Sequence, residues 1–255
     1  MDGFDAAQAA ARLAEAWRSG RGITSAALAP PGDVAAAYAA QRALVAALAP
    51  GQRVNTWKIS PRRPDAAPTA APIPPGRRLS SPAEVREVPG RLLGIEAEIA
   101  FRFGSDLPSR AEPYDEATAR GAVEAALVAI ELCATRLADW EQAAPLWRFA
   151  DLQSTACLVV GEPWRDWRAL DFAQLEAVVT VDGVEKMRRR GAHPNLDPSV
   201  LVAPLVAHAC GTGDGIRAGD VVTTGSWIGM LSVEAPVTID VRFEGVGDAR
   251  LRLLG

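Results

Sequence analysis

Histidine and cysteine are scarce in this chain of 255 residues, which holds two histidines and three cysteines. Cys133, Cys157 and Cys210 stand far apart without a CxxC spacing, so the sequence predicts neither a disulfide framework nor a thiolate zinc site. We interpret them as small buried hydrophobic residues in a reducing compartment. His193 and His208 are too far apart in the sequence to indicate a zinc pair or a catalytic triad.

The chain also lacks a basic excess and a long apolar run. The chain has 27 Lys and Arg residues and 31 Asp and Glu residues, which gives a net charge of −4. Nucleic-acid binding needs a basic face, so we expect no nucleic-acid partner. No run approaches the roughly 20 apolar residues that cross a bilayer, and the first residues do not resemble a secretory signal. We therefore expect a cytoplasmic protein without a membrane association.

What is present is alanine, proline and a series of short β-like runs. Alanine-rich patterns predict two helices, over about 5–17 and 33–48, with Asp33 as the cap of the second. Residues 60–92 hold eight of the 19 prolines and predict an extended covering segment, because proline removes backbone donors. Helices are also expected over about 115–127 and 199–210, and strands over 54–59, 95–103, 128–133, 156–160, 175–181, 221–224, 237–243 and 250–254.

This order of elements predicts an α+β fold. A helical segment, 1–50, would precede a strand-rich core, 51–255, and the two would form one structural domain. An alanine-rich hairpin with exposed apolar surface also favours self-association, so we expect a homo-oligomer.

The acidic residues of two predicted strands carry the most chemical information. Glu96 and Glu98 project from one face of a strand, with backbones about 7 Å apart. Glu131 is a lone acid in the apolar run VAIELCA, where an unpaired carboxylate is costly. Three hard oxygen ligands suit Mg²⁺ or Mn²⁺, with coordination positions left for water and substrate. The alternative is that Glu96 and Glu98 simply line the solvated face of a strand.

A series of motifs runs through nearly the whole chain. It reads, in order, AAAYAAQRAL, VNTWKIS, GIEAEIAFRF, AIELCATRLADW, FADLQSTACLVVG, AGDVVTTGSWIGM and VRFEGVGDARL. In order and spacing, the series resembles the 2-keto-4-pentenoate hydratase branch of the fumarylacetoacetate hydrolase superfamily. The resemblance implies a mixed β-roll core behind an N-terminal helical hairpin. It also implies a divalent metal, Mg²⁺ or Mn²⁺, on Glu96, Glu98 and Glu131, and a small 2-oxo acid or its enol as the substrate.

The same resemblance implies roles for five further residues. Lys58 of TWKIS matches the family's lysine, and burial near a metal would depress its pKa and suit it to proton transfer. Asp151 of FAD would bind a catalytic water. Thr224, Gly225 and Ser226 would hold the substrate carboxylate. Without the resemblance, these residues would be a solvated lysine, a turn aspartate and the end of a strand.

The chain also departs from this branch. Where the branch carries an acidic turn before the ExE motif, residues 77–81 read RRLSS and contain no carboxylate. Three outcomes stay open: hydration of a 2-hydroxy-2,4-dienoate, metal-dependent decarboxylation of a 2-oxo diacid, or a catalytically weakened paralogue that serves as an oligomer partner. A metal-polarised 2-oxo acid is drawn towards its enolate, which both reactions share. We expect the hydro-lyase.

Overall fold

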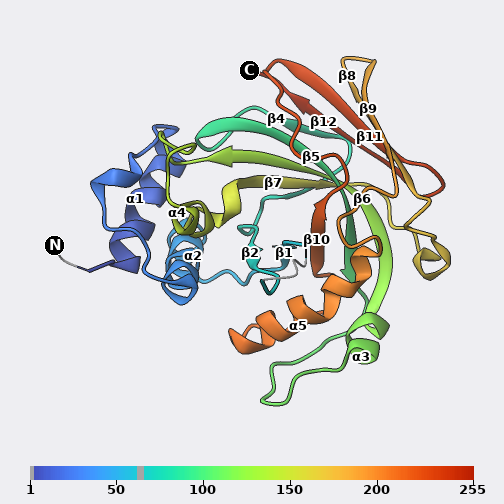
Figure 1. Ribbon diagram of the computed structural model, residues 1–255, viewed down its shortest axis with the longest axis horizontal. Helices are drawn as coiled ribbons and strands as arrows, with labels where there is room; N and C mark the ends of the chain where they lie inside the picture. The colour runs from blue at the N-terminus through green and yellow to red at the C-terminus, as the bar shows by residue number, and fades with distance from the viewer. Residues whose placement is uncertain (1–2, 62–65) are drawn as a thin grey trace.

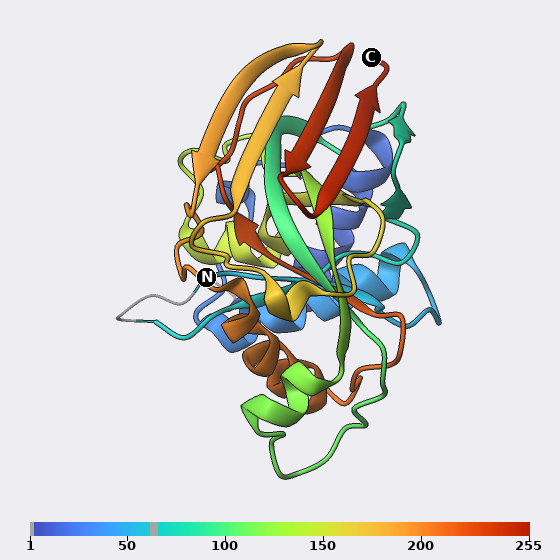
Figure 2. The same cartoon turned by 90° about the vertical axis from the view of Figure 1, so that its right-hand side faces the viewer.

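Two β-sheets that contain both parallel and antiparallel strands form the centre of the computed structural model, which describes residues 3–61 and 66–255. The larger sheet passes beside the helices, and the smaller one stands against it at the C-terminal side (Figures 1 and 2). In spatial order the larger sheet contains β2 (Ala70–Pro72), β1 (Thr56–Ile59), β10 (Val221–Ser226), β5 (Arg91–Phe103), β6 (Val123–Thr135), β7 (Thr155–Val160) and β3 (Arg78–Ser80). The smaller contains β4 (Ala83–Val85), β12 (Gly247–Leu253), β11 (Val237–Phe243), β8 (Glu176–Val181) and β9 (Val184–Arg190).

The helices gather in two places. In Figure 1, α1, α2 and α4 lie at the N-terminal end of the molecule, and α3 and α5 lie below the larger sheet. The α-helices are α1 (Ala6–Ser19), α2 (Val34–Leu48), α3 (Glu116–Gly121), α4 (Pro145–Ala150) and α5 (Val202–Gly211), and the 3₁₀ turns are η1 (Ser25–Ala27), η2 (Leu152–Ser154), η3 (Trp167–Ala169) and η4 (Pro198–Leu201). None of the helices in the described part of the chain is long and apolar enough to cross a membrane.

The first two helices begin where the sequence places them. Asp5 accepts hydrogen bonds from the backbone N–H groups of Ala7 and Gln8, and Asp33 accepts one from Ala36. These caps satisfy N–H groups that have no partner inside the helix. The expected helical hairpin therefore corresponds to α1 and α2.

The prediction of a helix over 115–127 is wrong beyond Gly121. Asp115 caps α3, but this helix ends at Gly121 and β6 begins at Val123. Nearly all of β6 is buried and pairs with β5 along its length. Pairing with β5 therefore overrides the local helical pattern. The proline-rich segment 60–92 contributes the short strands β2, β3 and β4 and the first two residues of β5, and its residues 62–65 lie outside the described part.

Strands β5 and β6 position the acidic residues. One face of this pair packs into the main core through residues such as Ile95, Ala97 and Ile130. The other face carries the acids, followed along the strands by Ala100 and Ala129, which belong to a smaller apolar cluster. The expected α+β class with mixed sheets is confirmed, whereas the narrower description of a β-roll and the division at residue 50 stay predictions.

Candidate active site

The three predicted acids lie on one face of the β5–β6 pair. Glu96 is the direct cross-strand partner of Glu131, and Glu98 follows two residues along β5. Carboxylate oxygens of Glu96 and Glu131 and the Sγ atom of Cys133 lie within 4.8 Å of one another. Cys133 reaches this cluster because it lies two residues after Glu131 on the same strand face. That spacing was the signal in the sequence, where we interpreted Cys133 only as a core residue.

Lys58 enters the cluster from β1. Its Nζ atom donates hydrogen bonds to Glu131 Oε1 at 2.5 Å and to the backbone oxygen of Gln153 at 3.3 Å. Burial acts to lower the pKa of Lys58, but Glu131 and then the other acids raise it above its usual value. Without a cation the carboxylates therefore hold a proton on Lys58, and the depression expected near a metal stays a prediction for the metal-bound site, where the ion would offset these charges.

Glu98 is held by the end of β10. Its Oε2 atom accepts a hydrogen bond from the Thr223 hydroxyl and another from the Gly225 N–H at 2.8 Å. Gly225 has a φ of +99°, and a Cβ there would lie 3.0 Å from Pro61 Cγ, so this position requires glycine. Burial, Glu131 and Glu96 raise the pKa of Glu98 to about 8.

A divalent cation fits these residues. Glu131 Oε2 is buried and has no hydrogen-bond partner among the described residues. When ionised, the three carboxylates and the Lys58 ammonium leave a formal charge of −2, which one divalent ion would neutralise. The available oxygens suit Mg²⁺ or Mn²⁺. Burial raises the pKa of the Cys133 thiol well above its usual range, so Cys133 stays a neutral, soft neighbour of this oxygen site.

A cleft of about 600 Å³ opens beside the acids. It is large enough for a small organic acid. Its polar lining comes from the sheet, η2 and α4, and its apolar lining from β5, α4 and neighbouring loops. Among the residues of this lining are Lys58, Glu96, Leu93, Cys133, Trp140, Leu146, Arg148, Phe149, Gln153 and Ser154.

The sequence profile of the fumarylacetoacetate (FAA) hydrolase C-terminal family matches residues 34–254. The chain belongs to this family. It is 32% identical to a 2-keto-4-pentenoate hydratase of Burkholderia vietnamiensis, over 96% of this chain and 95% of that protein. It is also 32% identical to a 2-keto-4-pentenoate hydratase of Paraburkholderia phymatum, but that match spans 61% of this chain and only 58% of the relative. The resemblance inferred from the motifs is confirmed.

Solved structures with the same fold include members that bind metal. The 4-oxalocrotonate decarboxylase of Pseudomonas putida G7, complexed with magnesium and adipate, has a TM-score of 0.82 at 19% identity, over 98% of this chain and 97% of that one. The fumarylpyruvate hydrolase of Pseudomonas aeruginosa, in complex with Mn²⁺ and pyruvate, has a TM-score of 0.53 at 15% identity, over 81% and 93%. At these identities the likeness establishes the fumarylacetoacetate hydrolase fold.

Asp151, which the family motif assigns to water binding, lies in a buried ion pair. Its Oδ1 atom accepts from Arg136 Nε at 2.5 Å, and its Oδ2 atom accepts from the Thr135 hydroxyl and the Arg136 N–H. Asp151 does not line the cleft. Burial raises its pKa, and Arg136 opposes that rise. This geometry is that of a positioning residue, and Arg136 is its structural partner.

The pair anchors an unusual turn beside Lys58. Leu152, Gln153 and Ser154 have φ values of +52°, +52° and +61°. Three consecutive non-glycine residues in the left-handed region are strained, and such strain persists only where the surroundings impose it. The turn directs the Gln153 carbonyl at Lys58, so it forms part of the wall of the cleft.

The expected carboxylate-binding loop is engaged within the protein instead. The Thr224 hydroxyl donates to the Ile99 carbonyl at 2.7 Å, and the Ser226 hydroxyl donates to the Gly229 carbonyl at 2.8 Å. The Gly225 N–H is directed at Glu98, as described above. The assignment of these groups to the substrate carboxylate stays a prediction, and the neighbouring Thr223, which the motif did not single out, faces the acids.

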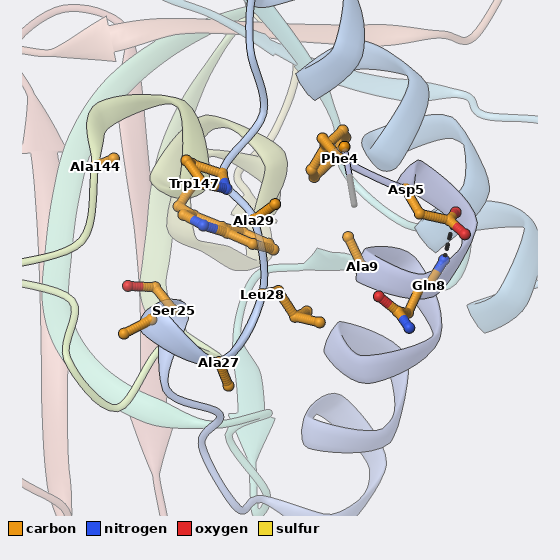
Figure 3. A pocket seen from close by; sticks show the side chains of 13 residues that line it. Phe4, Asp5, Gln8, Ala9, Ser25, Ala27, Leu28, Ala29, Ala144 and Trp147 are labelled. Carbon is orange, nitrogen blue, oxygen red and sulfur yellow. Dashed lines mark hydrogen bonds between the residues drawn. The ribbon is translucent and has the colours of Figure 1, made fainter. Parts of the chain in front are cut away.

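A larger hollow, of about 720 Å³, lies elsewhere, between the start of α1 and the loop around η1. Figure 3 shows Phe4, Leu28 and Trp147 around it, with Asp5 bonded to Gln8. Among the described residues of its lining, Asp5 is the charged one, and its carboxylate already caps α1. This hollow lacks the chemistry of the cleft.

Proposed function

We propose that this chain is a Mg²⁺- or Mn²⁺-dependent hydro-lyase that acts on a 2-hydroxy-2,4-dienoate or the related 2-oxo acid. The family comprises metal-dependent hydratases and decarboxylases, and a full-length match to a 2-keto-4-pentenoate hydratase supports the finer assignment. The observation that carries the proposal is the group of three carboxylates, with an unpartnered Glu131 oxygen, beside a cleft of suitable size.

Glu96, Glu98 and Glu131 would hold the cation. Bound there, it would supply Lewis-acid polarisation of a 2-oxo acid and favour enolisation. Thr223 and Gly225 orient Glu98 for this role. Such partners behind a ligand fix its orientation and support metal affinity.

Lys58 is the residue best placed to move a proton. Its Nζ atom is directed at the acid cluster and belongs to the lining of the cleft. The other polar groups of the cleft are less suitable, because Glu96 is assigned to the metal, arginine does not exchange protons in proteins and the Cys133 thiol stays neutral. The Gln153 carbonyl holds Lys58 in position.

Decarboxylation of a 2-oxo diacid is the second candidate. Residues 77–81 supply no acid to activate water, and Arg78 instead donates hydrogen bonds to the Asn55 and Gly219 carbonyls. Decarboxylation through an enolate does not require that water. The similarity in fold to the 4-oxalocrotonate decarboxylase is compatible with this reaction.

Two parallel assays test the proposal on the Mg²⁺-loaded protein. Decay of the dienol absorbance of 2-hydroxypenta-2,4-dienoate measures hydration, and CO₂ release from 2-oxohex-3-enedioate measures decarboxylation. We expect turnover of the dienoate, which Glu131→Gln abolishes. CO₂ release without turnover of the dienoate would overturn the assignment as a hydratase and support the decarboxylase. A folded, metal-bound protein that is inactive in both assays would overturn the proposal as a whole.

The third outcome, a weakened paralogue within an oligomer, is tested by the same assays. Turnover by the homo-oligomer alone contradicts it. Activity that appears only on co-expression with an active relative would support it.

A further inference from the structure

Arg148 on α4 is a cation of the cleft with an unused donor. Its Nε atom is buried and has no hydrogen-bond partner in the described part of the chain. Its Nη2 atom donates to the Glu141 carbonyl at 3.0 Å, and its Cζ atom lies 4.8 Å from the centre of the Trp140 ring. The nearby Glu141 carboxylate pairs with Arg91 instead, at 2.8 Å.

A buried donor without an acceptor is costly, especially on a charged group. The flat guanidinium presents its N–H groups in a fork that matches the two oxygens of a carboxylate. The Trp140 ring and the Glu141 carbonyl restrict this fork, so less conformational entropy is lost when an anion binds. Arg148 therefore offers the cleft a guanidinium of restricted conformation, and its covered Nε atom gains an acceptor when the side chain shifts towards a bound carboxylate.

The second cation of the lining, Lys58, is already paired with Glu131. Arg148 has no ion pair with any of the three acids, so its charge is not used to assemble the metal centre. Leu93, Leu146 and Phe149 supply apolar lining to the same cleft. The cleft thus combines a place for a metal-chelating group, apolar surface for a carbon chain and a separate cation.

We propose that Arg148 is a specificity-determining residue that binds a second carboxylate, at the far end of the substrate. The inference rests on the proposed function and adds, within its substrate class, a preference for 2-oxo diacids and their dienol forms over the corresponding monoacids. It applies to hydration and to decarboxylation alike, because Arg148 selects the substrate and does not choose the reaction.

Matched pairs of stable ligands test this inference by calorimetry on the Mg²⁺-loaded protein. 2-Oxopentanoate is compared with 2-oxoglutarate, and 2-oxohexanoate with 2-oxoadipate, so each pair differs by one terminal carboxylate. We expect the better-fitting diacid to bind about tenfold or more tightly than its monoacid, the range for a hydrogen bond to a charged group. Arg148→Gln should lower the affinity for each diacid to that of its monoacid, and Arg148→Lys should restore the preference in part.

The exposed Arg86 is the matched control, since Arg86→Gln removes the same charge away from the cleft. A wild-type protein that binds both members of each pair equally would overturn the inference, as would a preference that survives Arg148→Gln. Failure of the monoacids to bind the Mg²⁺-loaded protein would count against the proposed function instead. The wild-type comparison does not depend on how well a variant folds.

Discussion

Glu96 lies directly opposite Glu131 in the antiparallel β5–β6 ladder. Like charges in this position repel, and burial strengthens the repulsion. Lys58 offsets one of the charges by its contact with Glu131. The sheet therefore carries a charge imbalance that a divalent cation would remove.

Replacement of Glu131 by Gln should weaken Mg²⁺ and Mn²⁺ binding by more than about 100-fold. Loss of a residue that only hydrogen-bonds to a metal ligand lowers metal affinity by roughly 10- to 100-fold, and Glu131 is proposed as a ligand itself. The variant loses one charge and the unpartnered oxygen Oε2. Titration calorimetry measures the effect, with the exposed Glu112→Gln as the control. Unchanged affinity in Glu131→Gln would remove this residue from the metal site.

Thr223 and Thr224 offer a comparison between the two faces of one strand. Thr223→Val removes the hydroxyl that orients Glu98 and should weaken metal binding by about 10- to 100-fold. Thr224→Val removes a hydrogen bond to the Ile99 carbonyl and should lower the free energy of unfolding by about 1 kcal/mol without changing metal affinity. Calorimetry and urea unfolding separate the two effects. A metal defect in Thr224→Val would contradict the assignment.

Lys58→Met should destabilise the metal-free protein by about 3–5 kcal/mol at pH 9, because it leaves buried carboxylates without their cation. Saturating Mg²⁺ should recover much of this loss, so the metal-induced rise in Tm should be larger than in the wild type. The exposed Lys186 gives a control of the same type, Lys186→Met, which should change neither quantity. An equal rise in Tm in all three proteins would contradict this account.

The free energy of unfolding of the metal-free protein should fall as the pH rises from about 5 to about 8. Burial, Glu131 and Glu96 raise the pKa of Glu98 to about 8 in the folded state, so the folded protein keeps a proton that the unfolded chain releases at lower pH. Denaturant titrations across this range measure the slope. Glu98→Gln should make it shallower, and saturating Mg²⁺ should remove it, since the cation replaces the proton.

Asp151→Asn should lower the free energy of unfolding by about 3–5 kcal/mol, because it leaves the buried Arg136 without its carboxylate. Mg²⁺ affinity should change little, since Asp151 does not line the cleft. Unfolding curves and calorimetry check both statements. Loss of kcat with unchanged stability and unchanged Mg²⁺ affinity would instead support the catalytic role that the family motif suggested.

The sequence was sufficient to predict features that depend on local pattern. Alternation along 95–103 placed Glu96 and Glu98 on one face, and the cap at Asp33 marked the start of α2. The helix expected over 115–127 was wrong because β6 pairs with β5 from Val123 onward, and that pairing is not local. The series of motifs was sufficient to predict the family, because its order and spacing extend over nearly the whole chain.

Other features of the site required the register between strands. TTGS has two adjacent hydroxyls, and only the pairing of β10 with β5 shows that Thr223 faces Glu98 while Thr224 faces Ile99. The direction of the pKa shift of Lys58 depends on carboxylates from β5 and β6. No motif in the sequence marks Arg148, because its free Nε atom depends on how α4 packs beside the cleft.

The contact between Lys58 and Glu131 has a consequence for biogenesis. An internal ammonium acts as a temporary counter-ion, so the newly made polypeptide can reach its folded shape before it meets a metal. Metal binding then follows folding and is reversible, so it depends on the supply of the ion in the cell. A chelator would accordingly remove the metal and the activity that needs it without unfolding the protein.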